Sequence, residues 1–240
     1  MTWEGPPAGA IIAAGDGRRM REAGVALPKP LVPVNGVPLI EGVIRNFLAA
    51  GVTSLVVIVN AGSASCVEWV CSRFPALGIR FLVKTTGSSL ESFSEVVAAR
   101  TGTPLLVSTV DAWCRPHDFV AFVRASQARP AGSTVLALTP VVADEKPLWV
   151  DVDGAGRVTA VGGDSGALVT AGIYVFPGEA LALGIPAGLG RLRDYLAWLS
   201  TQRTPMYGEV IQTVVDVDRQ EDVALAETLA RAAVHSGGGV

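Results

Sequence analysis

An apolar segment that ends in glycines, close to the N-terminus, constrains the fold most strongly. Residues 9–14 have the composition of a buried strand, and the turn Gly15-Asp16-Gly17 follows them directly. Because glycine has no Cβ, such a turn exposes backbone N–H groups at the end of the strand, where they can bind an anion. Phosphate is the anion that α/β proteins most often bind in this way. The segment therefore predicts a nucleotide site in an α/β fold.

Cations close to this turn supply the charge that a triphosphate needs. Arg18 and Arg19 follow the turn, and Lys29 lies ten positions after Arg19. A pair of glycines alone would be weak evidence, since the third glycine of the dinucleotide fingerprint is replaced by Met20. Arginine and lysine beside the turn favour phosphate binding over a purely structural glycine turn.

Apolar runs alternate with amphipathic segments along the chain, which predicts a mixed, mostly parallel sheet between layers of helices. In the first half, we expect strands near residues 8–14, 53–59, 79–83 and 104–109, and helices near 38–50, 63–73, 89–100 and 116–129. In the second half, we expect strands at 134–139 and 168–176, a β-hairpin formed by 148–153 and 157–161, and helices near 188–203 and 219–234.

The domain organisation expected from this pattern is simple. We expect a single domain over residues 1–233, with a nucleotide-binding half at about 8–130 and an acceptor half at about 131–233. The glycine-rich end of the chain, residues 234–240, is expected to be a disordered tail.

Composition excludes several classes of protein. The net charge of −3 argues against a nucleic-acid surface. No apolar stretch approaches the ~20 residues of a membrane span, and no signal-peptide core precedes the first strand, so we expect a cytoplasmic protein. Three scattered cysteines are too few for a disulfide framework or a zinc site. A homo-oligomer is compatible with the sequence, but nothing in it indicates one.

Carboxylates that could hold a divalent cation occur at two strand ends. Asp111 follows the apolar segment 104–110, at the sheet edge where α/β proteins bind ligands. An N-cap for a following helix is the alternative role of Asp111. Asp216 and Asp218 are two residues apart, so in a strand they would share one face. Asp218 could instead cap the last helix, in a capping box with Glu221.

A second pair of carboxylates resembles a metal motif but has a simpler explanation. Asp151 and Asp153 form a D-x-D pattern, which occurs in metal-dependent glycosyltransferases. The pair lies beside the turn 154–156 of the expected hairpin, where aspartate is common for conformational reasons. We therefore favour a role in the turn.

The first forty residues resemble a known signature. The string A-A-G-x-G-x-R-M, followed by P-K-P-L and V-x-G-x-P-L-I, is similar to that of the nucleotidyltransferase superfamily. Its members include sugar-1-phosphate nucleotidyltransferases and molybdenum-cofactor guanylyltransferase-like proteins. The resemblance implies a Rossmann-like fold and Mg²⁺-dependent transfer of a nucleotidyl group from an NTP to a phosphorylated small molecule, with release of pyrophosphate. A non-catalytic nucleotide-binding homologue and a metal-dependent glycosyltransferase of similar fold are the alternatives.

The resemblance also implies roles for individual residues. Arg19 is expected to hold the phosphates of the leaving pyrophosphate, and Lys29 to neutralise the α-phosphate. Asp111 and Asp216, together with Asp218, are expected to hold Mg²⁺. The residues expected to bind the nucleotide belong to the glycine turn and to a later Gly-Ser pair; they are Ala13, Ala14, Gly15, Asp16, Gly17, Arg18, Gly87 and Ser88.

Three departures from the family pattern leave the substrates open. Arg18 replaces the Thr or Ser of many sugar enzymes, and Lys84 stands about where a glutamine often reads the base. A group that only donates hydrogen bonds thus replaces one that also accepts them. The Glu-Lys-Pro motif that follows the hairpin in hexose-1-phosphate enzymes instead precedes it here, at residues 145–147. The acceptor could therefore be another sugar phosphate, a phosphorylated polyol or amino alcohol, or a cofactor phosphate.

Overall fold

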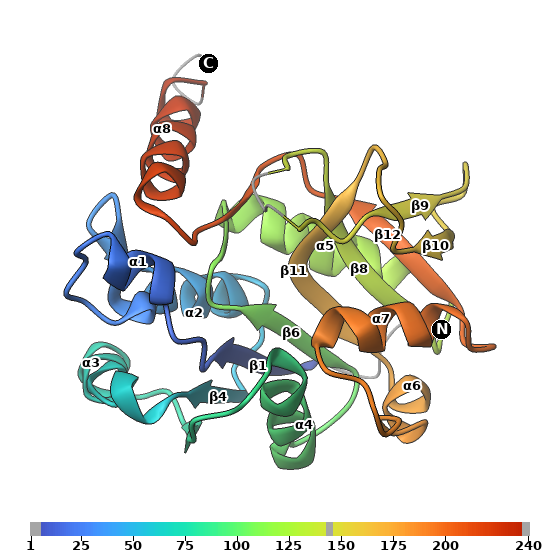
Figure 1. Cartoon of the computed structure of the whole chain (residues 1–240), viewed down its shortest axis with the longest axis horizontal. Helices are drawn as coiled ribbons and strands as arrows, with labels where there is room; N and C mark the ends of the chain where they lie inside the picture. Colours follow the sequence, from blue (N-terminus) through green and yellow to red (C-terminus); the bar gives the residue numbers. More distant parts are fainter. Residues whose placement is uncertain (1–5, 143–145, 237–240) are drawn as a thin grey trace.

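A seven-stranded sheet forms the centre of the computed structural model, which describes residues 6–142 and 146–236 (Figure 1). Its strand order is β12-β8-β11-β6-β1-β4-β5. The strands are β1 (Ala8–Ala13), β4 (Leu55–Val59), β5 (Ile79–Val83), β6 (Leu105–Thr109), β8 (Thr134–Thr139), β11 (Val169–Phe176) and β12 (Met206–Val210). Only β11 runs antiparallel to its neighbours in this sheet. The predicted mixed, mostly parallel sheet is confirmed.

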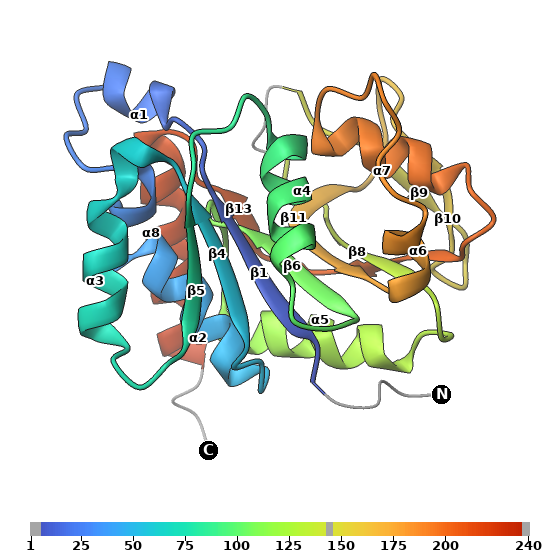
Figure 2. The ribbon, with the colours of Figure 1, turned by 90° about the horizontal axis from the view of Figure 1, so that it is seen from below.

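Helices cover both faces of the sheet because its central strands are apolar on both sides. One face carries α2 (Leu39–Ala49), α3 (Ser65–Arg73) and α5 (Pro116–Ala128), and the other carries α4 (Ser89–Ala99), α6 (Gly178–Ala182) and α7 (Leu192–Ser200) (Figures 1 and 2). Alternate residues of β1 point to opposite cores, with Ile11 on the α2 side and Ile12 on the α4 side. The helices expected in the first half therefore exist, within one or two residues of their expected ends.

Shorter elements lie around the edge of the sheet. They are α1 (Arg18–Glu22), the 3₁₀ turns η1 (Lys29–Leu31) and η2 (Ala61–Ser63), and the paired strands β2 (Pro33–Val34) with β3 (Val37–Pro38) and β7 (Ala112–Cys114) with β13 (Val214–Asp216). The predicted hairpin is present as β9 (Val150–Val152) and β10 (Val158–Val161). The last helix, α8, spans Gln220–Ser236.

Several boundaries differ from expectation; the helix expected to end at 203, for example, ends at Ser200. The helix expected over 188–203 begins only at Leu192, because Gly188 has a φ of +89° and Asp194 accepts the backbone N–H of Arg191 at 2.8 Å, which fixes the helix start. The tail is expected from residue 234, whereas α8 extends to Ser236; residues 237–240 lie outside the described part of the chain. Within the described ranges, no helix has the length and apolar character that a membrane crossing requires.

Candidate functional site

The glycine loop joins β1 to α1 at the carboxyl edge of the parallel strands and packs against Lys29. Gly17 has a φ of +58°, and a Cβ at this position would lie 2.9 Å from the Cβ of Lys29. Both the left-handed backbone and the close approach require glycine. Around Gly15, by contrast, there is open space for a Cβ. The loop and Lys29 thus form one packed unit, although twelve positions separate Gly17 from Lys29.

Asn60 anchors the loop from the neighbouring strand. This residue follows β4 directly and is buried. Its Nδ2 donates hydrogen bonds to the backbone carbonyl oxygens of Ala14, at 3.3 Å, and Gly15, at 2.9 Å. The sequence analysis missed Asn60; its position after an apolar strand, like that of Asp111, was the available signal.

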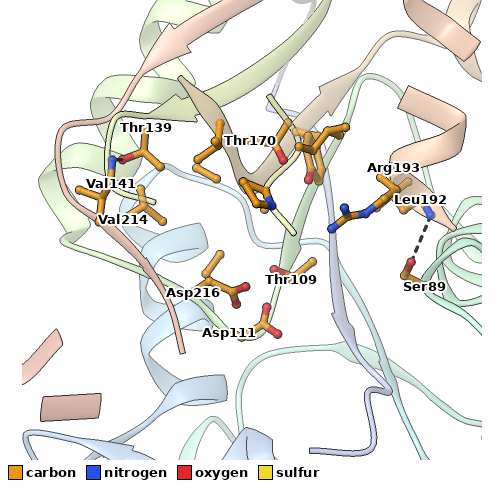
Figure 3. A pocket seen from close by; sticks show the side chains of 17 residues that line it. Ser89, Thr109, Asp111, Thr139, Val141, Thr170, Leu192, Arg193, Val214 and Asp216 are labelled. Carbon is orange, nitrogen blue, oxygen red and sulfur yellow. Dashed lines mark hydrogen bonds between the residues drawn. The ribbon is translucent and has the colours of Figure 1, made fainter. Parts of the chain in front are cut away.

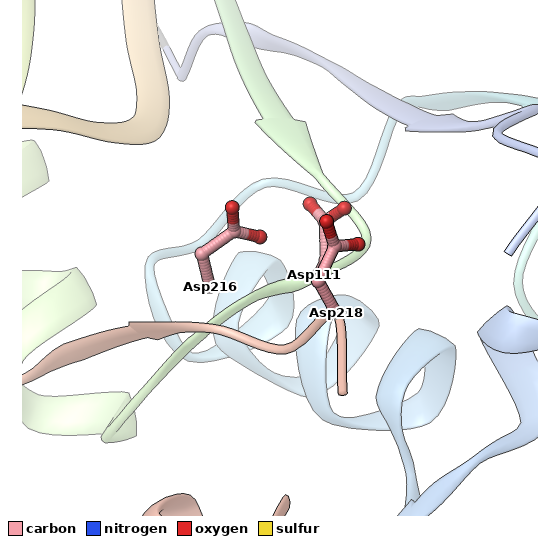
Figure 4. A group of neighbouring side chains, drawn as sticks. All are labelled: Asp111, Asp216 and Asp218. Atoms are coloured by element: carbon pink, nitrogen blue, oxygen red, sulfur yellow. The ribbon is translucent and has the colours of Figure 1, made fainter. Parts of the chain in front are cut away.

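Two cations and three carboxylates converge beside the loop. Lys29 Nζ donates to Asp111 Oδ2 at 2.6 Å and also contacts Asp218 Oδ1. Arg19 Nη1 contacts the other oxygen of Asp218. Asp111, Asp216 and Asp218 each offer one oxygen in a group whose members lie within 4.8 Å of one another (Figure 4). The five residues with the strongest expected chemical roles are therefore neighbours in space.

Pairing between two short strands brings the distant carboxylates together. In the β7–β13 ladder Asp216 lies opposite Ala112, the residue that follows Asp111. The backbone N–H of Val217 donates to the carbonyl oxygen of Asp111 at 3.0 Å. β13 ends at Asp216, so Asp218 lies beyond the strand and not on its face as expected. The two side chains nevertheless reach the same cluster.

The electrostatics of the cluster keep its buried members charged. Burial opposes the charged form of Lys29, which is only 7% exposed, but Asp111, Asp218 and Asp216 outweigh burial and raise its pKa above the ordinary value. Burial also opposes ionisation of Asp111, yet the charge and hydrogen bond of Lys29 hold the pKa of this carboxyl below its usual range. Lys29 and Arg19 thus face three carboxylates, so acidic side chains outnumber basic ones in the cluster by one.

The structure does not show the capping roles that were the alternatives for Asp111 and Asp218. Asp111 is followed by β7 and not by a helix, so it is not an N-cap. At the start of α8, the side chain of Asp222 accepts the backbone N–H groups of Asp218, at 2.9 Å, and Arg219, at 2.7 Å. Asp222, which the sequence analysis missed, thereby takes the part expected of Glu221.

The other residues expected to bind the nucleotide from the glycine loop differ in their exposure to solvent. Ala13 and Ala14 are buried, whereas Asp16 is exposed. The side chain of Arg18 is 77% exposed and its Nε lies 3.5 Å from Glu22 Oε1 on the next turn of α1. Arg18 therefore pairs with Glu22 on its own helix, whereas Arg19 contacts Asp218.

The Gly-Ser pair lies at the N-terminus of α4. Ser88 caps this helix by accepting the backbone N–H of Glu91 at 3.2 Å, and Gly87 donates its N–H to Glu91 Oε2 at 2.7 Å. Lys84 Nζ lies 2.6 Å from Glu95 and 3.3 Å from Glu91. The lysine that stands in place of a base-reading glutamine is thus paired with carboxylates of α4.

A cavity of about 300 Å³ opens next to the cluster, with Asp111 and Asp216 at one end (Figure 3). Strands β6, β8 and β11 supply hydroxyl groups to its wall, and Arg193 reaches into it from α7 (Figure 3). Burial raises the pKa of Tyr174, another lining residue, to about 12, so its phenol is neutral. Gly172, in the irregular part of β11, has a φ of +72°, and a Cβ there would lie 2.6 Å from Thr109 Oγ1.

Residues near the hairpin fall outside the cluster. Asp153 Oδ1 accepts the backbone N–H groups of Ala155 and Arg157, each at 2.9 Å, and Asp151 is exposed. The D-x-D pair therefore serves the turn. Of the Glu-Lys-Pro motif, Glu145 lies outside the described residues, and the backbone oxygen of Lys146 accepts a hydrogen bond from Arg193 Nη1 at 2.7 Å.

Comparison with known families agrees with this arrangement. The model of the MobA-like NTP transferase domain matches residues 9–171, which is more than half of the chain. The chain belongs to this family. The superfamily expected from the glycine loop is therefore confirmed, as is the class of enzyme domain, a nucleotidyltransferase.

The curated relatives match only part of the chain. A UTP–glucose-1-phosphate uridylyltransferase of Escherichia coli K12 is 32% identical over 135 residues, which cover 56% of this chain and 39% of that protein. The chain thus spans about two fifths of the length of the uridylyltransferases it matches. A 2-aminoethylphosphonate cytidylyltransferase of Lancefieldella rimae is 49% identical over 49 residues, 20% of each chain.

Solved structures show the fold. The inositol-1-phosphate CTP transferase of T. maritima superposes with a TM-score of 0.79 at 17% identity, covering 99% of this chain and 100% of that one. HddC of Yersinia pseudotuberculosis, solved with GMP-PN, gives a TM-score of 0.73 at 16% identity over 93% of this chain and 99% of that one. At these identities the likeness supports the Rossmann-like nucleotidyltransferase fold alone.

Proposed function

We propose that this protein transfers a nucleotidyl group from an NTP to a sugar phosphate or a similar phosphorylated small molecule, with release of pyrophosphate. The observation that carries the proposal is the convergence of Arg19 and Lys29 with Asp111, Asp216 and Asp218 beside a glycine loop. The activities of the relatives, uridylyl and cytidylyl transfer to small phosphates and phosphonates, favour the same class of reaction.

In the proposed reaction an oxygen of the acceptor phosphate forms a bond to the α-phosphorus of the NTP. The bond from this phosphorus to the oxygen that bridges to the β-phosphate breaks, and pyrophosphate leaves with the electron pair. No general base is required, because a phosphate monoester is already ionised at neutral pH. The protein mainly has to position two polyanions and offset the charge that develops between them.

The chain's own cations suit this task. Lys29 is held at the loop by packing against Gly17, so its ammonium group has a fixed place beside the α-phosphate in our proposal. Arg19 lies in the first turn of α1, two residues after Gly17, and would bind the β- and γ-phosphates through its planar guanidinium group. Backbone N–H groups of residues 15–17 would bind the triphosphate as well.

The acidic residues fit a hard divalent cation. Three carboxylates within 4.8 Å of one another form an all-oxygen donor set of the kind that Mg²⁺ prefers. Asp111 and Asp216 would hold the ion, with Asp218 close by. When bound, Mg²⁺ would polarise the phosphate oxygens and reduce the repulsion between the two substrates.

The cavity between β11 and α7 is the proposed acceptor site. It begins at Asp111 and Asp216, so a phosphate at this end would face the proposed NTP site. Arg193 is a cation in its wall, and hydroxyl groups such as those of Thr139 and Thr170 could bind a polyol. We assign the nucleotide-binding half to about residues 8–130 and the acceptor half to about 131–233 on the same grounds.

A pyrophosphate-release assay tests the proposal. The four NTPs are combined with Mg²⁺ and a panel of sugar phosphates, polyol phosphates and 2-aminoethylphosphonate. Release that needs one NTP and one acceptor, and that is lost in Lys29→Ala, supports the transferase. Binding of an NTP without release for any acceptor would favour a non-catalytic homologue. Hydrolysis of a nucleotide sugar that survives in Lys29→Ala would favour a glycosyltransferase.

A further inference from the structure

Arg19 and Lys29, the two cations assigned to the phosphates, converge on a single carboxylate, Asp218. Its two oxygens are divided between them, with Oδ2 on Arg19 Nη1 and Oδ1 on Lys29 Nζ. A nucleotide phosphate bound by the same pair of cations would have to take the place of this carboxylate. We propose that Asp218 is a positioning residue that occupies the phosphate site and is exchanged for phosphate oxygens when a triphosphate binds. This inference rests on the proposed function.

The contacts of Asp218 are those that an incoming anion can replace most easily. The side chains of Arg19 and Asp218 are 40% and 32% exposed, whereas that of Lys29 is 6% exposed. The pair of Arg19 with Asp218 is open to solvent and contributes little net stability, so its exchange costs little. Lys29 also pairs with Asp111, and this contact can remain, which keeps Lys29 paired while Asp218 moves.

The backbone around Asp218 is fixed, so the exchange requires only a side-chain rotation. Asp222, which is 9% exposed, accepts the N–H groups of Asp218 and Arg219. A triphosphate has more charge and more acceptor oxygens than one carboxylate, and it can therefore make more charge-assisted hydrogen bonds to the two cations. Until it arrives, Asp218 holds both cations toward one point.

The exchange links phosphate binding to the acidic cluster. A carboxylate displaced from Arg19 and Lys29 stays next to Asp111 and Asp216, where it adds negative charge beside the proposed cation site. Binding of a phosphate would thus move the Asp218 carboxylate away from Arg19 and Lys29 and make it available to the proposed Mg²⁺ site. Asp218 therefore competes with phosphate before the nucleotide binds. Its contact with a divalent metal ion follows nucleotide binding.

Binding of inorganic tripolyphosphate without divalent metal tests this inference. Calorimetric titrations in buffer with a chelator compare the wild-type protein with Asp218→Asn and with the matched control Asp216→Asn, which removes an equal charge from the same cluster. Because Asp218→Asn weakens the contacts with both cations, it should bind tripolyphosphate about tenfold more tightly than the wild type. Asp216→Asn, which leaves the contacts of Asp218 with both cations in place, should gain about threefold or less.

The outcomes separate the inference from the proposed function. An equal gain in tripolyphosphate affinity in the two variants, or weaker binding by Asp218→Asn, overturns the proposed exchange of Asp218 for phosphate. If Lys29→Ala loses the binding that the wild type shows, the proposed phosphate site is still supported. Absence of binding in every variant overturns both. If Asp218→Asn does not fold, a crystal structure of the wild type with tripolyphosphate decides. Asp218 must have left Arg19 and Lys29 there, and its persistence on both cations refutes the proposal.

Discussion

Replacement of Lys29 by methionine probes the centre of the cluster with little change in packing. Methionine keeps a flexible stem to pack against Gly17 but removes the charge that Asp111 and Asp218 contact. The substitution would leave three carboxylates facing Arg19 alone, directly beside the proposed α-phosphate. Loss of one preorganised charge contact of this kind costs about 3 kcal/mol in the transition state. We therefore expect kcat to fall by about a hundredfold or more.

The same substitution should lower stability moderately. Breaking a buried ion pair costs about 3–5 kcal/mol when the remaining charge cannot reach water. The side chain of Asp111 is 25% exposed and can be partly hydrated, so we expect a loss of about 1–2 kcal/mol. Urea denaturation measures this loss, and the pyrophosphate-release assay measures kcat at saturating substrates.

A matched control separates the site from a general effect of charge. Lys84 is 46% exposed and pairs with Glu91 and Glu95, so Lys84→Met removes the same charge outside the cluster and should leave kcat within about twofold of the wild type. If folded Lys29→Met retains kcat within about threefold of the wild type, the role assigned to Lys29 is wrong.

Three further predictions concern stability and the loop. The pKa of Asp111 is lowered and that of Lys29 is raised, so their contribution to the free energy of unfolding should be constant between the ordinary Asp and Lys values, about pH 4 and 10, and decrease outside them. Urea denaturation from pH 3 to 9 should show the acid loss in the wild type, and an equal loss in Lys29→Met would contradict the pairing. Gly17→Ala should cost about 1–2 kcal/mol because of its left-handed backbone, whereas Gly15→Ala should change stability by less than about 0.5 kcal/mol; equal melting temperatures would refute this. Asn60→Ala removes two hydrogen bonds to the loop and should weaken NTP binding about tenfold in calorimetry, and unchanged affinity would show that the loop keeps its conformation without Asn60.

Local chemistry explains why much of the fold and part of the site could be predicted. Runs of apolar residues indicate the buried strands, such as β1 and β4. The glycine turn, Arg19 and Lys29 all lie within the first thirty residues of the sequence. Asp111 stands out because it ends an apolar strand. These features depend on residues close together in the chain, which a pattern can capture.

What could not be predicted depends on contacts between distant segments. Nothing in the spacing shows that Asp218 contacts Arg19, 199 positions away, because the β7–β13 pairing that brings them together is tertiary. Asn60 and Arg193 likewise acquire their places from the order of strands in the sheet. β12 was missed because the sequence of its five residues, with Gly208 and Glu209 inside, lacks a clear strand pattern.

The antiparallel strand β11, inside the sheet between β8 and β6, limits how the molecule can move. β11 pairs with β6 over Ile173–Phe176 and with β8 on its other side, so one hydrogen-bonded ladder joins the strands below the glycine loop to those below the cavity. The two halves cannot open about a hinge, as separate lobes do, without breaking this ladder. We therefore expect any movement on substrate binding to be confined to short segments such as the glycine loop and the β9–β10 hairpin, which both extend from this sheet.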